Sequence, residues 1–525
     1  MGFLRIRTDD SNKYKIKRRV KNLLDIITFS LGYFKLYFHQ IIRQTGLTTR
    51  PAVEVLGKIR LYRHSDYGLL ISAAIVGILV GLFIDLFHVS MGYAENLFRY
   101  LRTSSGELIG WKIAALPLVT ALGGLFVGIL KKTLFKGATL EGLHAVVGAL
   151  VYQEGKINWK NTFQSIVCAA LTISSGGGAG REGPTIVLGA SLGSTFAQLF
   201  RLKPQQLRVL CGSGAAAAIS GIFNAPLGGI VFALEAIIGE ISIRSFTPLV
   251  IASVLATATS RLMVGDKPLL ITPELASVSL QDYFFLALAG MTSGIVAYYY
   301  LKTYYWTYNN VKWSVRRVPQ FLRPAIGGLI VGIVLVILPT MWETTYNPIN
   351  YVIAGKGMPL IRGSMFEEVK VWFQKDNIVF LWIIVAAATI ILKPFSNAVT
   401  LASGGAGGTM APVIKVGAMY GFCFGSLLHF IYPGTSPGMY AVVCAAALFS
   451  GTYQVPLTGG IVLFEICRNY NLILPLVFSS VFASFIIQKT RIVTFNPLQR
   501  DIVDDEDKLH PVLKPGQEPI EINKG

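Results

Sequence analysis

The chain has 525 residues, of which 53% are hydrophobic and 14% are charged, and its formal net charge is +19 at pH 7. Soluble domains contain about 25% charged residues, so this composition excludes an ordinary soluble protein and predicts one that crosses a membrane several times. The five cysteines lie in apolar surroundings without a CxxC pattern, which predicts small core residues and argues against a metal or redox centre.

The first element in the chain is a basic segment, residues 1–65. The apolar pattern of Ile27–Ile42 predicts an amphipathic helix on the cytoplasmic membrane face. The charges are typical of a cytoplasmic arm beside anionic lipid, and we expect no nucleic-acid partner. No cleavable signal is expected, because the first apolar run arrives late. The cations of the segment include Lys13, Lys15, Lys17, Arg18, Arg19 and Lys21.

Long apolar runs follow this segment and predict membrane-embedded helices. Some runs are shorter than the ~20 residues that span a bilayer. Short or broken helices are tolerated in a membrane only when they are buried in protein or line a polar cavity. The pattern therefore predicts a transport fold of tilted and broken helices rather than a simple bundle. The runs are Tyr67–Phe87, Ile109–Ile129, Thr247–Ser260, Tyr283–Trp306, Ile326–Leu338, Ile378–Leu392 and Leu472–Ile487.

Two pairs of similar segments indicate that the chain contains two homologous halves. Ser175–Ala190 reads SGGGAGREGPTIVLGA, and Ser403–Ala418 reads SGGAGGTMAPVIKVGA. Farther along each half, Ser220–Glu235 reads SGIFNAPLGGIVFALE and Ser450–Glu465 reads SGTYQVPLTGGIVLFE. Interrupted segments at matching positions of two repeats are the best indication of a substrate site in a membrane protein.

The repeat also divides the chain. We predict a first half-repeat of the transmembrane domain at 66–270 and a second at 271–495. Their junction is expected near Leu262–Ser279, a polar stretch with glycine and prolines. A short cytoplasmic tail without regulatory domains is predicted at 496–525. The stretch Thr344–Asp376 mixes glycine, proline and charge, and it is expected to form a loop with short helices.

Each half contains a glycine-rich break that leads into an apolar helix. A helix that begins after such a break presents unpaired N–H groups and the positive end of its dipole, and Pro184 and Pro412 suit its first turn. Two such helix starts, converging from opposite halves, would form an anion site at mid-membrane. The alternative is that the glycines only allow close helix packing, which does not explain two matched clusters.

Glu182 is the most informative single residue, because the second copy has Met410 at the matching position. A carboxylate beside a helix N-terminus is electrostatically favourable, so it can compete with a permeating anion for the same donors. Protonation would release it, which would make one residue both gate and proton carrier. Acids inside a membrane are functional by default. The alternative is a structural salt bridge to Arg181.

Three further charged residues fall in the apolar part of the chain. Glu235 and Glu465 occupy equivalent positions of the two halves, which favours a structural role at a helix end. Lys393 follows an apolar run and precedes Pro394. This lysine could pair with an acid or add positive potential near a pore, and the sequence does not separate these two roles.

The ordered motifs resemble those of the CLC family of chloride channels and chloride/proton antiporters over roughly residues 66–500. Gly180–Pro184 reads GREGP, the string around Asn224 reads GIFNAPLGGIVFALE, and the second copy contains SGGAGGTMAP. The resemblance implies an all-α polytopic membrane protein with two inverted homologous halves, assembled as a homodimer with one pore per subunit. It identifies Glu182 as the external gating glutamate.

The resemblance also implies an anion-binding set with several departures from the family pattern. Ala138 stands where the family has a serine, unless Thr139 supplies that hydroxyl. Met410 replaces a phenylalanine, and Phe495 replaces the tyrosine that contacts the central anion. Anion binding at the central site would then rely more on backbone N–H groups. The set is Gly137, Ala138, Thr139, Gly180, Arg181, Gly183, Thr409, Met410, Ala411 and Phe495.

A last departure concerns protons. The internal proton glutamate of the antiporters would follow Glu235 directly, but Ala236 stands there. The sequence therefore favours chloride transport by a voltage-gated channel or an uncoupled carrier gated by Glu182. The alternatives are a chloride/proton antiporter and a transporter of another anion, such as fluoride or nitrate.

Other functional classes are not supported. The six histidines are scattered, and the apolar runs contain no HExxH motif or paired aspartates, so we expect neither an enzyme nor a cofactor. The expected partners are chloride or another small anion, protons, the lipid bilayer and a second copy of the chain. The absence of a signal and of regulatory domains favours a bacterial plasma membrane.

Overall fold

The computed structural model of this protein describes residues 65–102, 115–138, 140–239, 243–266, 268–272, 282–342, 346–355 and 378–499. The secondary structure of these residues is helical, with a single isolated β-bridge between Gly180 and Gly408. The predicted basic segment, most of the C-terminal tail and of the loop Thr344–Asp376, and Thr139 lie outside the described residues, and what was predicted for them stays a prediction.

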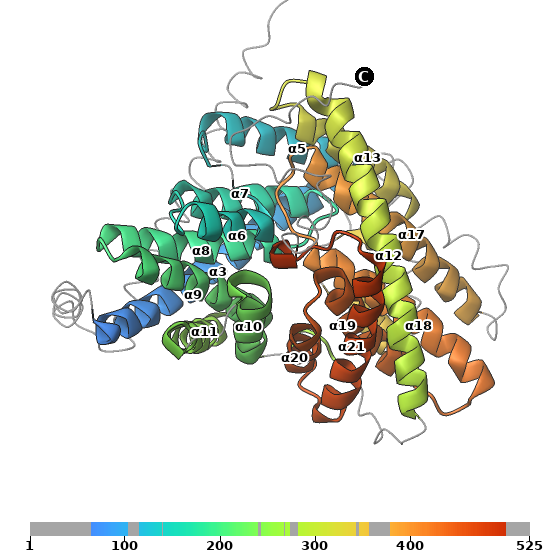
Figure 1. The fold of residues 1–525 in the computed structure, drawn as a ribbon. Coiled ribbons are helices and arrows are strands. Elements are labelled where there is room, and N and C mark those ends of the chain that lie inside the picture. The colour runs from blue at the N-terminus through green and yellow to red at the C-terminus, as the bar shows by residue number, and fades with distance from the viewer. Residues whose placement is uncertain are drawn as a thin grey trace, which may run out of the picture. The chain divides into compact units, whose positions relative to one another are not determined.

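The helices of the first half run from blue to green in Figure 1. Three of the predicted apolar runs fall in α3, α5 and α11, although the run Ile109–Ile129 is described only from residue 115. The last turn after α10 is a π-helix, η1 (Leu234–Ile238). The helices are α3 (Asp66–Arg102), α5 (Leu116–Thr133), α6 (Gly142–Tyr152), α7 (Lys160–Ser174), α8 (Glu182–Leu199), α9 (Pro204–Phe223), α10 (Pro226–Ala233) and α11 (Ile243–Val264).

The second half repeats this order and runs from yellow to red in Figure 1. The other four apolar runs fall in α12, α13, α17 and α21. A short 3-10 turn, η3 (Pro339–Met341), follows α13. The helices are α12 (Asp282–Ser314), α13 (Arg323–Ile337), α14 (Asn347–Ile353), α17 (Ile378–Ala402), α18 (Met410–Ile431), α19 (Pro437–Tyr453), α20 (Pro456–Cys467) and α21 (Ile473–Thr490).

Eight helices in the described part of the chain are long and apolar enough to cross a membrane. Others, such as α13 and α20, are apolar but shorter. Two of the long helices, α9 and α18, are mostly buried inside the protein. The predicted polytopic fold with short and broken helices is therefore confirmed.

Helix packing follows the sequence repeat. α8 packs along α9, and its counterpart α18 packs along α19. Elements near the centre contact their own counterparts, since α5 packs on α13 and α10 packs on α20. Such self-pairing is expected when two equivalent halves meet around a pseudo-two-fold axis.

Glycines bring the innermost helices close together. A Cβ atom at Gly189 of α8 would lie 2.1 Å from the carbonyl oxygen of Gly214 in α9. In the second half, a Cβ atom at Gly421 of α18 would lie 2.0 Å from the carbonyl oxygen of Tyr440 in α19. Backbones approach this closely only where side chains are absent. The close-packing role considered for glycines therefore applies inside these helices.

Candidate anion site between two helix starts

The two glycine-rich breaks meet and hold the starts of α8 and α18 together. Gly180 N–H donates to the Gly408 carbonyl oxygen at 2.8 Å, and Gly408 N–H donates back to Gly180 at 2.7 Å. The side-chain amide of Asn397, in α17, donates to the carbonyl oxygens of Gly178 and Gly408 at 3.1 and 3.2 Å. The predicted convergence of two helix starts from opposite halves is therefore present in the structure.

The Glu182 carboxylate lies across this junction. Its side chain is fully buried, at 0% exposure. Its Oε2 atom accepts from the N–H group of Ala411, in the first turn of α18, at 3.3 Å. Its Oε1 atom accepts from the hydroxyl of Tyr346, just before α14, at 2.7 Å. The carboxylate thus occupies a helix N-terminus of the other half, which is where an anion would be stabilised.

Arg181 is a more distant partner of this carboxylate. Its Nε atom lies 3.8 Å from Glu182 Oε1, and its guanidinium group lies 5.1 Å from the centroid of the Tyr346 ring. The two hydrogen bonds from Ala411 and Tyr346 are shorter than the ion pair. The geometry therefore favours a carboxylate held by donors of the second half over a simple structural salt bridge.

Two buried lysines hold the backbone of residues 340–342. Lys393, in α17, donates to the carbonyl oxygen of Met341 at 2.9 Å. Lys415, in α18, donates to the carbonyl oxygens of Thr340 and Trp342 at 3.2 and 3.4 Å. Both lysine side chains are almost fully buried, at 0% and 1% exposure. Lys393 thus anchors a backbone carbonyl group, a role not considered from the sequence, and the two roles left open for it stay predictions.

Thr409, Met410 and Phe495 line the same region. Thr409 precedes α18, Met410 begins it, and Met410 is buried at 2% exposure. Phe495 is buried, and its N–H group donates to the carbonyl oxygen of Thr452 at 2.9 Å. Its ring packs 5.3 Å from that of Tyr453, and the Tyr453 hydroxyl is hydrogen-bonded to Thr409. The structure therefore connects Phe495 to the start of α18 through Tyr453.

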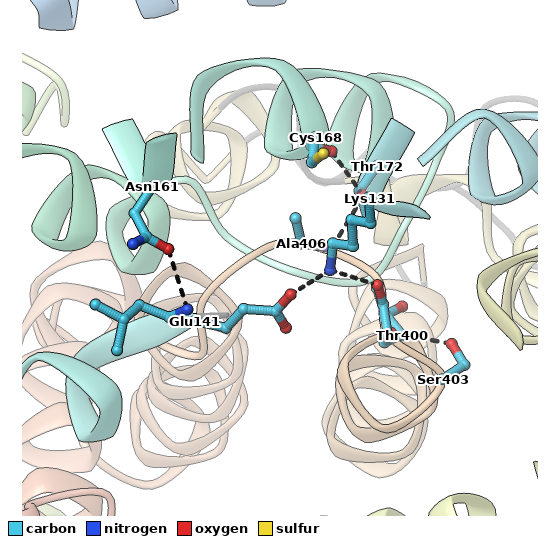
Figure 2. Close-up of polar contacts among 10 residues, drawn as sticks. Lys131, Glu141, Asn161, Cys168, Thr172, Thr400, Ser403 and Ala406 are labelled. Carbon is cyan, nitrogen blue, oxygen red and sulfur yellow. Dashed lines mark hydrogen bonds and ion pairs between the residues drawn. The ribbon is translucent and has the colours of Figure 1, made fainter. Parts of the chain in front are cut away.

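The predicted residues Gly137 and Ala138 belong to a separate loop between α5 and α6. Gly137 has a φ of 88°, and Ala138 is buried. Among the described residues, no hydrogen bond joins either of them to Glu182 or α18. Figure 2 shows how this loop is attached nearby: Lys131 of α5 forms an ion pair with Glu141 and donates to the Gly404 carbonyl oxygen. Lys131 thus links Glu141, at the end of this loop, to the glycine-rich break of the second half.

Glu235 and Glu465 form reciprocal contacts between the halves. The Glu235 carboxylate accepts from the N–H group and hydroxyl of Thr458, in the first turn of α20, at 2.8 and 2.6 Å. The Glu465 carboxylate accepts from the N–H groups of Leu227 and Gly228, in the first turn of α10, at 3.2 and 2.6 Å. Each acid therefore caps a helix of the opposite half, as the predicted structural role requires.

Tyr346 and Tyr453 are site residues that the sequence interpretation missed. Tyr346 is far from Glu182 along the chain, and nothing near it in the sequence indicates their contact. For Tyr453 a signal existed in the repeat, because the matching residue of the first half is Phe223. The Tyr453 hydroxyl is thus present in one copy only, just as the Glu182 carboxylate is present in one copy and replaced by Met410 in the other.

Comparison with known proteins agrees with this architecture. The family model described as "Voltage gated chloride channel" matches residues 123–488. A "Putative chloride channel protein ClcB-like" of Ralstonia nicotianae is 28% identical over 373 residues, which cover 69% of this chain and 80% of that protein. The "H(+)/Cl(-) exchange transporter ClcA" of Vibrio parahaemolyticus is 26% identical over 432 residues, 81% of this chain and 87% of that one.

A solved structure gives the same fold. The crystal structure of a slow cyanobacterial Cl-/H+ antiporter superposes with a TM-score of 0.70 at 20% sequence identity. The match covers 84% of this chain and 99% of that chain. The predicted all-helical arrangement of two inverted halves is thus confirmed at the level of the fold.

Proposed function

This chain belongs to the voltage-gated chloride channel (CLC) family, and from that premise we propose that it exchanges chloride for protons across a membrane. Members of this family transport anions through a membrane-embedded path. The observation that supports the proposal best is the buried Glu182 carboxylate, bound to the N–H group of Ala411 at the start of α18.

In this mechanism the carboxylate and the anion compete for one set of donors. While Glu182 is ionised, it accepts hydrogen bonds from Ala411 and Tyr346 and blocks access to the helix start. A proton on Glu182 removes its negative charge and weakens these bonds, so that the side chain can leave and chloride can take its place. Transport should therefore become faster as the pH falls.

Exchange, rather than passive conduction, is supported by the relatives. The sequence alone favours a channel or uncoupled carrier, because Ala236 replaces the inner acid, and Ala236 is fully buried in η1. Two observations support exchange: a ClcA relative named as an exchange transporter aligns over most of both chains, and the slow antiporter has the same fold. Passive chloride conduction remains the second candidate on the basis of Ala236 and of the ClcB-like relative.

The assembly and location follow from the same premise. Among its relatives are bacterial proteins, so we place it in a bacterial plasma membrane. The family typically forms homodimers with one transport path per subunit, and we propose that arrangement here.

Competition with fluoride and nitrate in a flux assay would identify the preferred anion.

The test is chloride efflux from liposomes that contain the purified protein, with external pH recorded at the same time. Exchange predicts that protons enter the liposomes against their gradient while chloride leaves down its own gradient. Passive conduction predicts chloride efflux without proton movement. Absence of chloride flux would contradict both.

The matched variants are Glu182→Gln and Glu154→Gln. The first removes the titratable carboxyl group at the helix start and should abolish proton movement and the response to pH, while chloride flux persists. The second changes an exposed glutamate that pairs with Lys156 on the surface, and it should behave like the parent protein. Unchanged pH dependence in Glu182→Gln would contradict the role proposed for Glu182.

A further inference from the structure

A pair of hydroxyl groups lies where α18 begins. The Oγ1 atom of Thr409 and the Oη atom of Tyr453 are hydrogen-bonded to each other. Thr409 directly precedes α18, and Ala411, two residues farther on, donates its N–H group to Glu182. The hydroxyl pair therefore lies beside the donors for which an anion would compete with Glu182.

The pair holds one more donor than its own hydrogen bond uses. Each hydroxyl has one O–H donor, and the mutual bond engages only one of the two. Among the described residues, neither hydroxyl has a second hydrogen-bond partner. The Tyr453 side chain is buried at 3% exposure, and a buried O–H group without an acceptor is unfavourable. The remaining O–H group is therefore suited to an acceptor that arrives along the transport path.

Two phenylalanine rings pack against Tyr453. The rings of Phe449 and Phe495 lie 5.0 and 5.3 Å from that of Tyr453, and Met410 follows Thr409 directly. Ala138 and Phe495 stand at the two positions where the family resemblance expects hydroxyls, and Thr139, the alternative to Ala138, lies outside the described residues. The Thr409–Tyr453 pair thus adds a side-chain donor beside the N–H groups at the start of α18.

We propose that the Thr409–Tyr453 hydroxyl pair donates a hydrogen bond to the permeating anion and makes the site prefer chloride over larger, weakly hydrated anions. The inference rests on the proposed function, because it concerns the anion that Glu182 displaces. A strongly hydrated anion needs polar donors to replace its water, and the lost donor should therefore affect chloride more than thiocyanate.

The experiment uses the full-length protein, with chloride and thiocyanate binding measured by calorimetry and flux measured in liposomes. The variants are Tyr453→Phe, Thr409→Val and the double variant, each of which removes hydroxyl groups with little change in shape. The control is Tyr299→Phe, because the Tyr299 hydroxyl donates to the Ile391 carbonyl oxygen on an exposed face. Size-exclusion profiles check that each variant is folded.

The double variant should bind chloride about tenfold more weakly or worse, since a hydrogen bond to a charged group contributes that much. Thiocyanate binding should change less, and Tyr299→Phe should match the parent protein. Chloride affinity of the double variant within about twofold of the parent would overturn the inference, as would equal losses for both anions. If the hydroxyl-pair inference fails in this way but Glu182→Gln still abolishes the response to pH, the proposed function remains intact. A parent protein without chloride flux would overturn both.

Discussion

At the scale of single residues, Tyr346 is the donor that joins Glu182 to the second half. Its hydroxyl lies 2.7 Å from Glu182 Oε1, and a hydrogen bond stabilises the ionised carboxylate over the protonated one. The buried lysines Lys393 and Lys415 fix the backbone of residues 340–342 shortly before it.

Tyr346→Phe should move the midpoint of acid activation to higher pH. Without the hydroxyl the ionised form of Glu182 is less stable, so a proton binds at a lower proton concentration. A hydrogen bond to a charged group contributes about 1.5–3 kcal/mol, which is the interaction that this variant removes. The measurement is chloride flux in liposomes against pH. Tyr299→Phe serves as the control, and an unchanged midpoint in Tyr346→Phe would show that the contact does not restrain the gate.

Asp85 is a buried acid that, unlike Glu182, has no hydrogen-bond partner among the described residues. It lies in α3 at 8% exposure, and neither carboxyl oxygen makes a hydrogen bond with a described residue. A buried polar group without a partner costs about 1–3 kcal/mol. Asp85→Leu should therefore raise the melting temperature of the protein in detergent.

The control for Asp85→Leu is Asp66→Leu, which changes an exposed acid at the first residue of the same helix. That variant removes no buried polar group, so it should give no gain in stability. A lower melting temperature for Asp85→Leu than for the parent would indicate that Asp85 has a stabilising partner after all.

At the scale of helices, the reciprocal caps make α10 and α20 depend on each other. Glu465→Gln keeps the shape of the side chain but replaces a charged acceptor of two N–H groups, those of Leu227 and Gly228, by a neutral one. The expected loss is about 1–2 kcal/mol, seen as a lower melting temperature. Glu235→Gln should give a similar loss, whereas Glu154→Gln on the surface should not. Equal stability of all three variants would contradict a capping role.

The sequence predicted the elements better than their contacts. Within the described residues, the seven apolar runs lie almost entirely in helices, because a long apolar stretch in a membrane has few alternatives to a helix. The repeat also predicted that the starts of α8 and α18 converge and that Glu182 lies there. It did not predict Tyr346 or the anchoring role of Lys415, because side chains that meet through the fold leave no local pattern. Comparison of the two copies could have drawn attention to Lys415, since this charged residue matches the apolar Val187 in the first half.

At the scale of the molecule, neither half contains a complete site. Glu182 comes from the first half, and its donors Ala411 and Tyr346 come from the second. The halves are also joined without the connecting chain, since Thr120 Oγ1 donates to the Gly328 carbonyl oxygen at 2.6 Å. Assembly therefore depends on the interface more than on the link between α11 and α12.

A chain cut between α11 and α12 should accordingly remain functional when both pieces are produced together. We expect the two pieces to copurify and to carry chloride, whereas either piece alone should carry none. The measurement is affinity purification through a tag on one piece, followed by liposome flux. Pieces that both reach the membrane but do not copurify would contradict this expectation.

The paired caps of Glu235 and Glu465 have a consequence for the history of the chain. Because each acid serves the helix that corresponds to its own neighbour in the other copy, two identical single-half proteins in opposite orientations could make both contacts at once. An ancestor of half the length could thus have worked as an antiparallel pair before gene duplication joined the copies. Fusion then freed each copy to diverge, and the glutamate of GREGP could be kept on one side while its counterpart became methionine.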